Sequence, residues 1–385
     1  MRFRSVFSTK RADMSPLEKL VQVNWGLILL ISGVACIGFA MQYSAAGGSA
    51  EPWADRQMAR FGVGLVLLLA VALIDLRAWF RFAYGFYVVA LLLLIAVEVA
   101  GRIGMGAQRW LALGPLQLQP SELMKIALIL VLARWFHGLT HEQTGRPQWL
   151  VWPTVLTLIP AALLVKQPDL GSALLLILVT GAVFFLAGVR LWMFVVVIGA
   201  GLAFVPVAWR FMRDYQKQRV LTFLNPENDP LGAGYHIIQS KIALGSGGVW
   251  GKGFLLGTQS HLQFLPEKQT DFIFTMFAEE FGMAGGVVLV ALYALILVYG
   301  TMIALQAKSQ FGRLVAGGVM ATFWVYAFIN MAMVMGLLPI VGEPLPFVSY
   351  GGTALMALLI SFGLVINVYV HRDVWVGRHG IGDGT

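Results

Sequence analysis

Residues 272–303 read FIFTMFAEEFGMAGGVVLVALYALILVYGTMI, and Glu279 and Glu280 are the only charged residues in this stretch. A helix that crosses the hydrocarbon core of a bilayer needs about 20 consecutive, mostly apolar residues. The whole chain has the same character, because 58% of its 385 residues are hydrophobic and only 12% are charged. Soluble domains carry about 25% charged residues, so most of this chain must have lipid as its solvent.

Ten stretches of this kind predict an all-α integral membrane protein, a polytopic bundle of about ten transmembrane helices. They lie at roughly residues 23–43, 57–76, 81–99, 121–137, 149–166, 169–188, 190–209, 272–303, 313–336 and 350–371. The predicted organisation is an N-terminal segment at residues 1–22, a membrane domain at residues 23–371 and a tail at residues 372–385. A long polar loop, residues 209–271, separates the seventh and eighth helices.

The basic residues predict the orientation in the membrane. Ten spans put both termini on one side, which carries fourteen of the 27 Lys and Arg residues, whereas the other side carries six outside the long loop. Cytoplasmic loops have an excess of Lys and Arg, so we expect cytoplasmic termini and a 209–271 loop that faces outward. The net charge of +8 therefore reflects membrane orientation, and no nucleic-acid partner is expected.

The 209–271 loop is unusual in its length and charge, since it holds 12 charged residues. Loops of this length in compact proteins are generally functional or disordered, and its aromatic residues argue against disorder. Ile237, Ile238 and Ile242 recur at helical spacing beside Gln239 and Lys241. This pattern predicts an amphipathic helix near residues 235–245 that lies in the membrane interface.

Ionisable residues at membrane depth are costly, so they are functional candidates. They are Glu98, Glu122, Lys125, Lys166, Asp169, Asp271, Glu279, Glu280 and Glu343. With ten spans, nearly all of them fall at or near the outward ends of helices. This placement predicts a polar crater that faces outward, rather than an ion path through the middle of the membrane.

Asp271 lies where the polar loop meets an apolar helix. A carboxylate there can be partly desolvated, which raises its pKa and makes it a better general base. The alternative is an acid that only stabilises the helix N-terminus. Glu122 and Lys125 are three residues apart and share a helix face, so they form either a structural ion pair or a site in which Lys125 neutralises a phosphate.

No intrinsic metal site is expected. The chain contains no Asp-x-Asp pair, which leaves a metal-bound nucleotide-sugar donor unsupported. No cluster of His and Cys residues has the spacing of metal ligands.

Seven strings occur in a characteristic order. They are QRWL (108–111), QPSE (119–122), QPDLG (167–171), DYQKQR (214–219), DPLGAGYH (229–236), TDFIF (270–274) and PLPFVSYGG (344–352). Together they resemble the SEDS family (shape, elongation, division, sporulation), and its elongation branch more closely than its division branch. The resemblance covers about residues 20 to 373.

The resemblance implies a ten-helix bundle and a peptidoglycan glycosyltransferase that polymerises lipid II outside the bacterial cytoplasmic (inner) membrane during cell elongation and rod-shape maintenance. The family's catalytic aspartate matches Asp271, and its Glu and Lys on the fourth helix match Glu122 and Lys125. The implied partners are lipid II, the growing glycan strand, a class B penicillin-binding protein that supplies the transpeptidase, other elongation-complex proteins and membrane lipids.

The chemistry expected of such an enzyme is an inverting displacement of undecaprenyl pyrophosphate, with Asp271 as the general base. Cations must hold the pyrophosphate, and the candidates are Lys125, Arg109, Arg210 and Lys241, with Glu122 in the same substrate-binding site. No intrinsic cofactor is expected, although a divalent cation (Mg²⁺ or Mn²⁺) can accompany the substrate pyrophosphate.

Three alternatives remain open at this point. A lipid II flippase would do no bond chemistry and would need ionisable groups near the membrane midplane. A non-catalytic scaffold of the elongation machinery would tolerate the loss of Asp271. The third alternative is a division paralogue of the same family.

Overall fold

The computed structural model describes residues 15–104, 107–113, 116–212, 214–229, 232–258 and 267–377. Its long helices fall on the predicted stretches. They are α3 (Trp25–Ala45), α4 (Ala54–Leu73), α5 (Leu76–Ala100), α6 (Pro120–His137), α8 (Val151–Lys166), α9 (Leu170–Ala187), α10 (Leu191–Phe211), α14 (Ile273–Gln306), α15 (Gln310–Val334) and α16 (Gly352–Val370). The predicted all-α polytopic membrane fold is confirmed.

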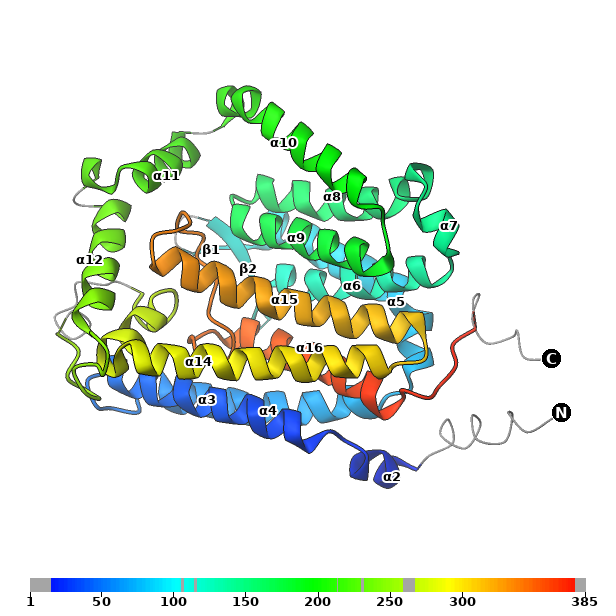
Figure 1. The fold of residues 1–385 in the computed structure, drawn as a ribbon, viewed down its shortest axis with the longest axis horizontal. Helices are drawn as coiled ribbons and strands as arrows, with labels where there is room; N and C mark the ends of the chain where they lie inside the picture. Colours follow the sequence, from blue (N-terminus) through cyan, green and yellow to red (C-terminus); the bar gives the residue numbers. More distant parts are fainter. Residues whose placement is uncertain are drawn as a thin grey trace.

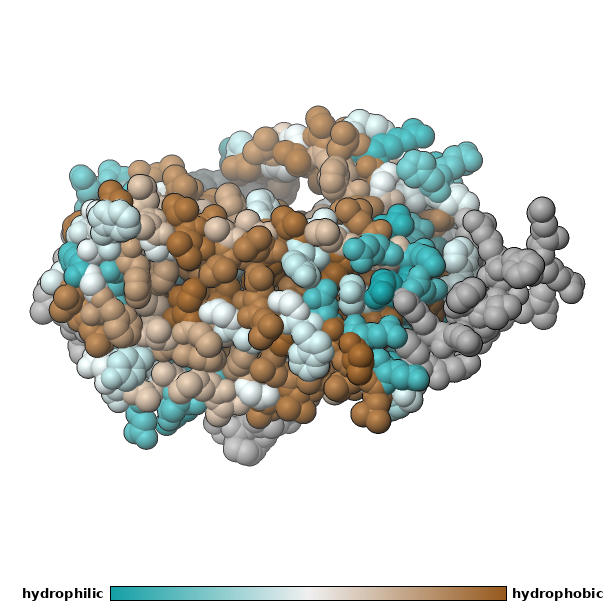
Figure 2. All heavy atoms as spheres, turned by 60° about the horizontal axis from the view of Figure 1, so that its bottom comes forward, coloured by the Kyte–Doolittle hydropathy of each residue, from teal (hydrophilic) through white to brown (hydrophobic). Residues whose placement is uncertain are grey.

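Seven of these helices are long and apolar enough to cross a membrane within the described part of the chain, namely α3, α4, α5, α9, α14, α15 and α16. The helices α8 and α10 are apolar but contribute shorter segments. A total of ten spans therefore stays a prediction. Figure 2 shows a broad apolar surface, with hydrophilic residues gathered mainly toward the ends of the molecule.

The helix α6 forms the centre of the bundle. It packs against α5, α15, α9, α16 and α8, and most of its residues are buried. A helix that is hydrophobic on all sides is typical of a protein core or of a membrane span. Its N-terminus carries Glu122 and Lys125, so the bundle holds two ionisable side chains at its core. Figure 1 shows α14, α15 and α16 running alongside one another, with α3 and α4 beside them.

A small antiparallel sheet lies between α5 and α6 and was not predicted. Its strands are β1 (Arg102–Gly104), β2 (Ala107–Leu113) and β3 (Leu116–Leu118), in the order β1-β2-β3. Two of these strands have only three residues, too few for an alternating pattern to be recognised. The sheet positions Arg109, which lies on β2.

The 209–271 loop is largely helical where the structure describes it. It contains the end of α10, then α11 (Asp214–Leu224), the short 3₁₀ helix η2 (Pro226–Asn228) and α12 (Ala233–Ser246), which arch toward the start of α14 (Figure 1). The helix predicted near residues 235–245 is confirmed as α12. Ser240 anchors it to the bundle through its hydroxyl, which lies 2.7 Å from Thr275 Oγ1 and donates to the backbone oxygen of Val334 at 2.7 Å.

Three short helices complete the described chain: α2 (Pro16–Val21), α7 (His141–Thr144) and the 3₁₀ helix η1 (Pro147–Trp149). The helix α2 and the chain after α16 lie at the same end of the molecule (Figure 1). At that end the backbone amide of Lys308 donates to the backbone oxygen of Arg372 at 3.0 Å. This contact ties the α14–α15 turn to the segment that follows α16.

The helix α14 is broken at Gly282, whose φ of 66° lies in the left-handed region. Residues 248–253 fill the break: the amides of Lys252 and Gly253 donate to the backbone oxygens of Glu279 and Glu280, each at 3.0 Å. The backbone oxygens of Gly248 and Val249 accept from Met283 and Ala284, each at 2.9 Å. Irregular backbone at membrane depth is tolerated where its polar groups are paired within the protein.

The two acidic side chains beside this break are buried and have partners. Glu279 forms an ion pair with Lys252 at 2.7 Å, and Ser44 donates a hydrogen bond to Glu280. Adjacent residues on a helix cannot face the same way, so each carboxyl needs its own partner, and different segments of the chain supply the two. The Lys252–Glu279 pair also joins the long loop to α14.

Candidate active site

An open cavity of about 590 Å³ lies where α14 begins. Its wall combines β2, the starts of α6, α9 and α16, part of α11, the turn before α14 and the segment between α15 and α16. Its ionisable lining residues are Arg109, Glu122, Asp169, Arg219, Glu267, Asp271 and Glu343. The expected polar crater is therefore present at this end of the bundle.

Asp271 lies in the turn just before α14 and is partly exposed to the cavity. Its burial raises the pKa of the carboxyl to about 6, an effect that nearby Glu267 reinforces and that Thr270 and Arg109 oppose. Gly342 faces it closely, since a Cβ at that position would lie 3.4 Å from Asp271 Oδ2. A carboxylate with a raised pKa at the edge of a cavity is suited to accept a proton.

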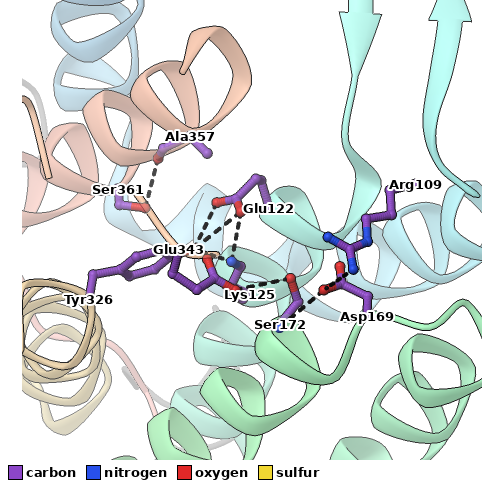
Figure 3. Close-up of polar contacts among 9 residues, drawn as sticks. All are labelled: Arg109, Glu122, Lys125, Asp169, Ser172, Tyr326, Glu343, Ala357 and Ser361. Atoms are coloured by element: carbon purple, nitrogen blue, oxygen red, sulfur yellow. Dashed lines mark hydrogen bonds and ion pairs between the residues drawn. The ribbon is translucent and has the colours of Figure 1, made fainter. Parts of the chain in front are cut away.

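Glu122 and Lys125 form the predicted pair, with a distance of 2.7 Å between Lys125 Nζ and Glu122 Oε1. Tyr326 of α15 completes the cluster, because its hydroxyl lies 3.1 Å from both Glu122 oxygens and also accepts a hydrogen bond from Lys125. The ammonium group lies 4.6 Å from the centre of the Tyr326 ring. Figure 3 shows this cluster, in which each charge has a partner.

The position of Lys125 is behind Glu122 rather than on the wall of the large cavity. Both residues line a smaller adjoining pocket, of about 40 Å³, between α6, α15 and α16. The helix α6 begins at Pro120, one residue before the predicted stretch, and within the described residues no side chain caps it at its N-cap residue, Gln119. The Ser121 hydroxyl makes no hydrogen bond to a described residue.

A second polar group lies across the cavity floor. Arg109 Nη2 donates to the backbone oxygen of Pro168 at 2.8 Å and lies 3.7 Å from Asp169 Oδ1. Asp169 caps α9 by accepting a hydrogen bond from the amide of Ser172 at 3.4 Å. The Ser172 hydroxyl in turn donates to Glu343 Oε1 at 3.4 Å, as Figure 3 shows.

Two residues of this site were not singled out from the sequence: Tyr326, and Asn330, whose side-chain amide donates to the backbone oxygen of Asp271 at 3.0 Å. Both belong to the apolar helix α15 and are buried, and a neutral polar residue in a membrane helix is a weaker signal than a charged one. Polar side chains one turn apart in an apolar helix could have been recognised as a polar stripe. Glu343 was recognised as ionisable, but no role was predicted for it.

Two predicted cations do not reach the cavity. Arg210 is exposed near the end of α10, and Lys241 is an exposed residue of α12 whose side chain packs over Gly336. Neither is among the described residues that line the cavity, whereas Arg219 of α11, which was not predicted, is among them. Lys166 pairs with Glu98 at 3.1 Å outside the cavity.

Comparisons with known proteins agree with this architecture. Residues 19–374 match the family FtsW/RodA/SpoVE, described as "Cell cycle protein". The chain is similar to "Peptidoglycan glycosyltransferase MrdB" of Escherichia coli strain K12, with 45% identity over 90% of this chain and 94% of that protein. It is less similar to "Probable peptidoglycan glycosyltransferase FtsW" of Trichlorobacter lovleyi, with 37% identity over 91% of this chain and 94% of that protein.

Solved structures show the same similarity. One chain, from a structure described as "Structural coordination of polymerization and crosslinking by a peptidoglycan synthase complex", superposes with a TM-score of 0.80 and 34% identity, covering 91% of this chain and 98% of that chain. The rod shape determining protein RodA of Thermus thermophilus superposes with a TM-score of 0.67 and 32% identity, covering 91% and 97%. The chain therefore belongs to the FtsW/RodA/SpoVE family of membrane proteins.

Proposed function

We infer that this chain is a peptidoglycan glycosyltransferase of the RodA type, which polymerises lipid II into glycan strands. The observation that carries this inference is the carboxyl of Asp271, which has a raised pKa and lies at the edge of a cavity of about 590 Å³. The similarity to MrdB exceeds the similarity to FtsW. This order supports a role in elongation rather than division.

The proposed reaction needs one well-placed base. Asp271 takes the proton from the 4-hydroxyl of the acceptor GlcNAc while that oxygen attacks C1 of the donor MurNAc. The bond between C1 and the pyrophosphate oxygen breaks, the leaving group keeps the electron pair, and the configuration at C1 inverts. Since pyrophosphate is a good leaving group, no general acid is required, and general base catalysis contributes about 10²–10⁴-fold.

One cationic side chain on the cavity wall and one buried behind it support binding of the pyrophosphate. Arg109 lines the cavity, and Lys125 lies behind Glu122, held in place by Glu122 and Tyr326. We propose that Arg109, Lys125 and Glu122 form the substrate-binding site. The proposal leaves out Arg210 and Lys241, because both side chains lie away from the cavity.

A divalent cation is proposed only as part of the substrate. Among the residues that the structure describes, no three His, Cys, Asp or Glu side chains are grouped so that they could hold a metal ion. A cation such as Mg²⁺ or Mn²⁺ would arrive with the pyrophosphate and offset its charge.

The proposed setting is the bacterial cytoplasmic membrane, with both termini in the cytoplasm and the cavity facing outward. An even number of spans is supported by the position of α2 and of the chain after α16, which lie at the same end of the molecule (Figure 1). The proposed partner is a class B penicillin-binding protein, which supplies the transpeptidase. Its support is the similarity to a chain of a peptidoglycan synthase complex.

Polymerisation of lipid II by the purified chain, with and without the penicillin-binding protein, tests this function. We expect long glycan strands when both proteins are present. A flippase would move lipid II between leaflets of a vesicle without forming glycan, and a scaffold would do neither. Flipping without polymerisation, under conditions in which the partner is bound, would contradict the proposal.

A further inference from the structure

Glu343 is a buried carboxyl that forms no ion pair with a described residue. It lies in the segment between α15 and α16, lines the cavity, and is 5% exposed. Its side chain accepts one hydrogen bond, from Ser172 Oγ to Oε1 at 3.4 Å. It forms no ion pair within 4.0 Å with any residue that the structure describes. Buried carboxylates are normally paired with a cation, so this arrangement is unusual.

The charged and titratable groups that face Glu343 are mostly acidic. They are Lys125 and Glu122 of α6, Asp169 at the start of α9, Asp271 before α14 and Tyr326 of α15. Burial, which is the largest effect, and the three neighbouring carboxyls together raise the pKa of Glu343 to about 8, although Lys125 opposes them. At neutral pH the group is therefore largely a neutral acid.

The excess of acidic residues in the cavity explains why a protonated Glu343 would favour the binding of an anion. Five acidic residues line the cavity, but only two guanidinium groups, those of Arg109 and Arg219, do so among the described residues. A fully ionised cavity would repel a pyrophosphate. A protonated Glu343 removes one negative charge and also provides a hydrogen-bond donor.

The Ser172 hydroxyl sets the orientation of this donor. Because Ser172 donates to Oε1, Oε1 acts as the acceptor oxygen, which leaves Oε2 to carry the proton. No hydrogen bond joins Oε2 to a described residue. A ligand in the cavity can therefore accept a hydrogen bond from the protonated Oε2, while the hydrogen bond from Ser172 to Oε1 stays in place.

We propose that Glu343, as a neutral acid, is a further substrate-binding residue that donates a hydrogen bond to a phosphate oxygen of the lipid pyrophosphate. This inference rests on the proposed function, since it takes a lipid pyrophosphate as the ligand. The acid lines the cavity, and Lys125, which lies behind Glu122 and acts on Glu343 through its charge, attracts the same anion. Loss of the proton replaces a donor with a like charge, so the affinity falls as the pH rises through about 8.

Binding of undecaprenyl pyrophosphate to the full-length chain in lipid nanodiscs tests the inference. The variants are Glu343→Gln, which keeps a donor at every pH, and Glu343→Ala, which removes it. Glu98→Gln is the matched control, since Glu98 pairs with Lys166 outside the cavity. Affinities are measured from about pH 6.5 to about pH 9.5, on either side of the raised pKa, and thermal unfolding confirms that each variant is folded.

We expect the affinity of the wild type, divided by that of Glu343→Gln, to fall by about ten- to a hundredfold over this range, the effect of one hydrogen bond to a charged group. The pyrophosphate ionises in the same way in both experiments, so dividing the two affinities at each pH removes this effect. At low pH, Glu343→Ala should bind undecaprenyl pyrophosphate at least about tenfold more weakly than Glu343→Gln does. Glu98→Gln should follow the wild type throughout.

Two results would overturn the inference. One is a ratio of wild type to Glu343→Gln that is constant with pH, and the other is equal binding by Glu343→Gln and Glu343→Ala. If the wild type polymerises lipid II and binds the probe but either of these results is found, only the proposed role of Glu343 is refuted. If the wild type neither polymerises lipid II nor binds the probe, the proposed function fails with it.

Discussion

The side-chain amide of Asn330 donates a hydrogen bond to the backbone oxygen of Asp271, at 3.0 Å. The same nitrogen donates to the backbone oxygen of Glu343 at 2.8 Å. A single amide in α15 therefore joins the turn that carries the proposed base to the segment that carries Glu343. The two sides of the cavity are held at a fixed separation by this residue.

Replacement of Asn330 by Ala should lower the turnover rate by about ten- to a hundredfold, because small displacements of a catalytic group have effects of this size. Initial rates at saturating lipid II measure the change. Asn367→Ala is the matched control: this fully buried amide donates to the backbone oxygens of Val71 and Ala72, at 3.1 and 3.0 Å. It should lose stability but keep its turnover rate. Equal rates in the two variants would refute the role of Asn330.

Loss of the Lys125 charge should affect stability and activity separately. Lys125→Met leaves Glu122 as an uncompensated buried charge, which costs about 3–5 kcal/mol. The double variant Lys125→Met/Glu122→Gln removes both charges and should recover most of that stability without recovering polymerisation. Thermal unfolding and glycan synthesis measure the two effects. An active double variant would mean that the pair is only structural.

The pH dependence of the rate should show the ionisation of Asp271. A base acts in its deprotonated form, so kcat/KM should fall as the pH drops through about 6, the pKa of this carboxyl. Glu267 contributes to the raised pKa, and Glu267→Gln should move this acidic limb to lower pH. Glu98→Gln should leave it in place. An acidic limb that Glu267→Gln does not move would argue against Asp271 as the titrating base.

The break in α14 should make Gly282 intolerant of a side chain. A Cβ there would lie 2.3 Å from the amide nitrogen of Gly251, and its φ of 66° is unfavourable for other residues. Gly282→Ala should therefore destabilise the protein by about 1–3 kcal/mol or more. Gly181→Ala in α9, where nothing lies within 4 Å, should be neutral or slightly stabilising. Thermal unfolding of the two variants provides the comparison, and similar losses would be inconsistent with a strained break.

The sequence predicted the helices well because each long run of apolar residues indicates a lipid-embedded helix without reference to the rest of the chain. The charged pair Glu122 and Lys125 was also predictable, since residues three apart share a helix face. Asp271 stood out because it lies at a junction between polar and apolar sequence. All three signals are local along the chain.

The remaining features depend on contacts between distant segments. The break at Gly282 is stabilised by residues 248–253, and neither segment shows this alone. The cavity faces Arg219 rather than Arg210 or Lys241, which depends on the path of α11 and α12 across the bundle. Tyr326 and Asn330 are neutral, so the sequence does not mark them, and their roles follow only from their hydrogen bonds to residues of other segments.

The central claim is that Asp271 is the base of a sugar transfer, and Asp271→Asn tests it most directly. The change keeps the size of the side chain but removes its ability to accept a proton. The measurement is lipid II polymerisation by the purified variant in complex with its penicillin-binding protein, after folding and complex formation have been confirmed. The account predicts a loss of about 10²–10⁴-fold in rate, whereas polymerisation near the wild-type rate would contradict it.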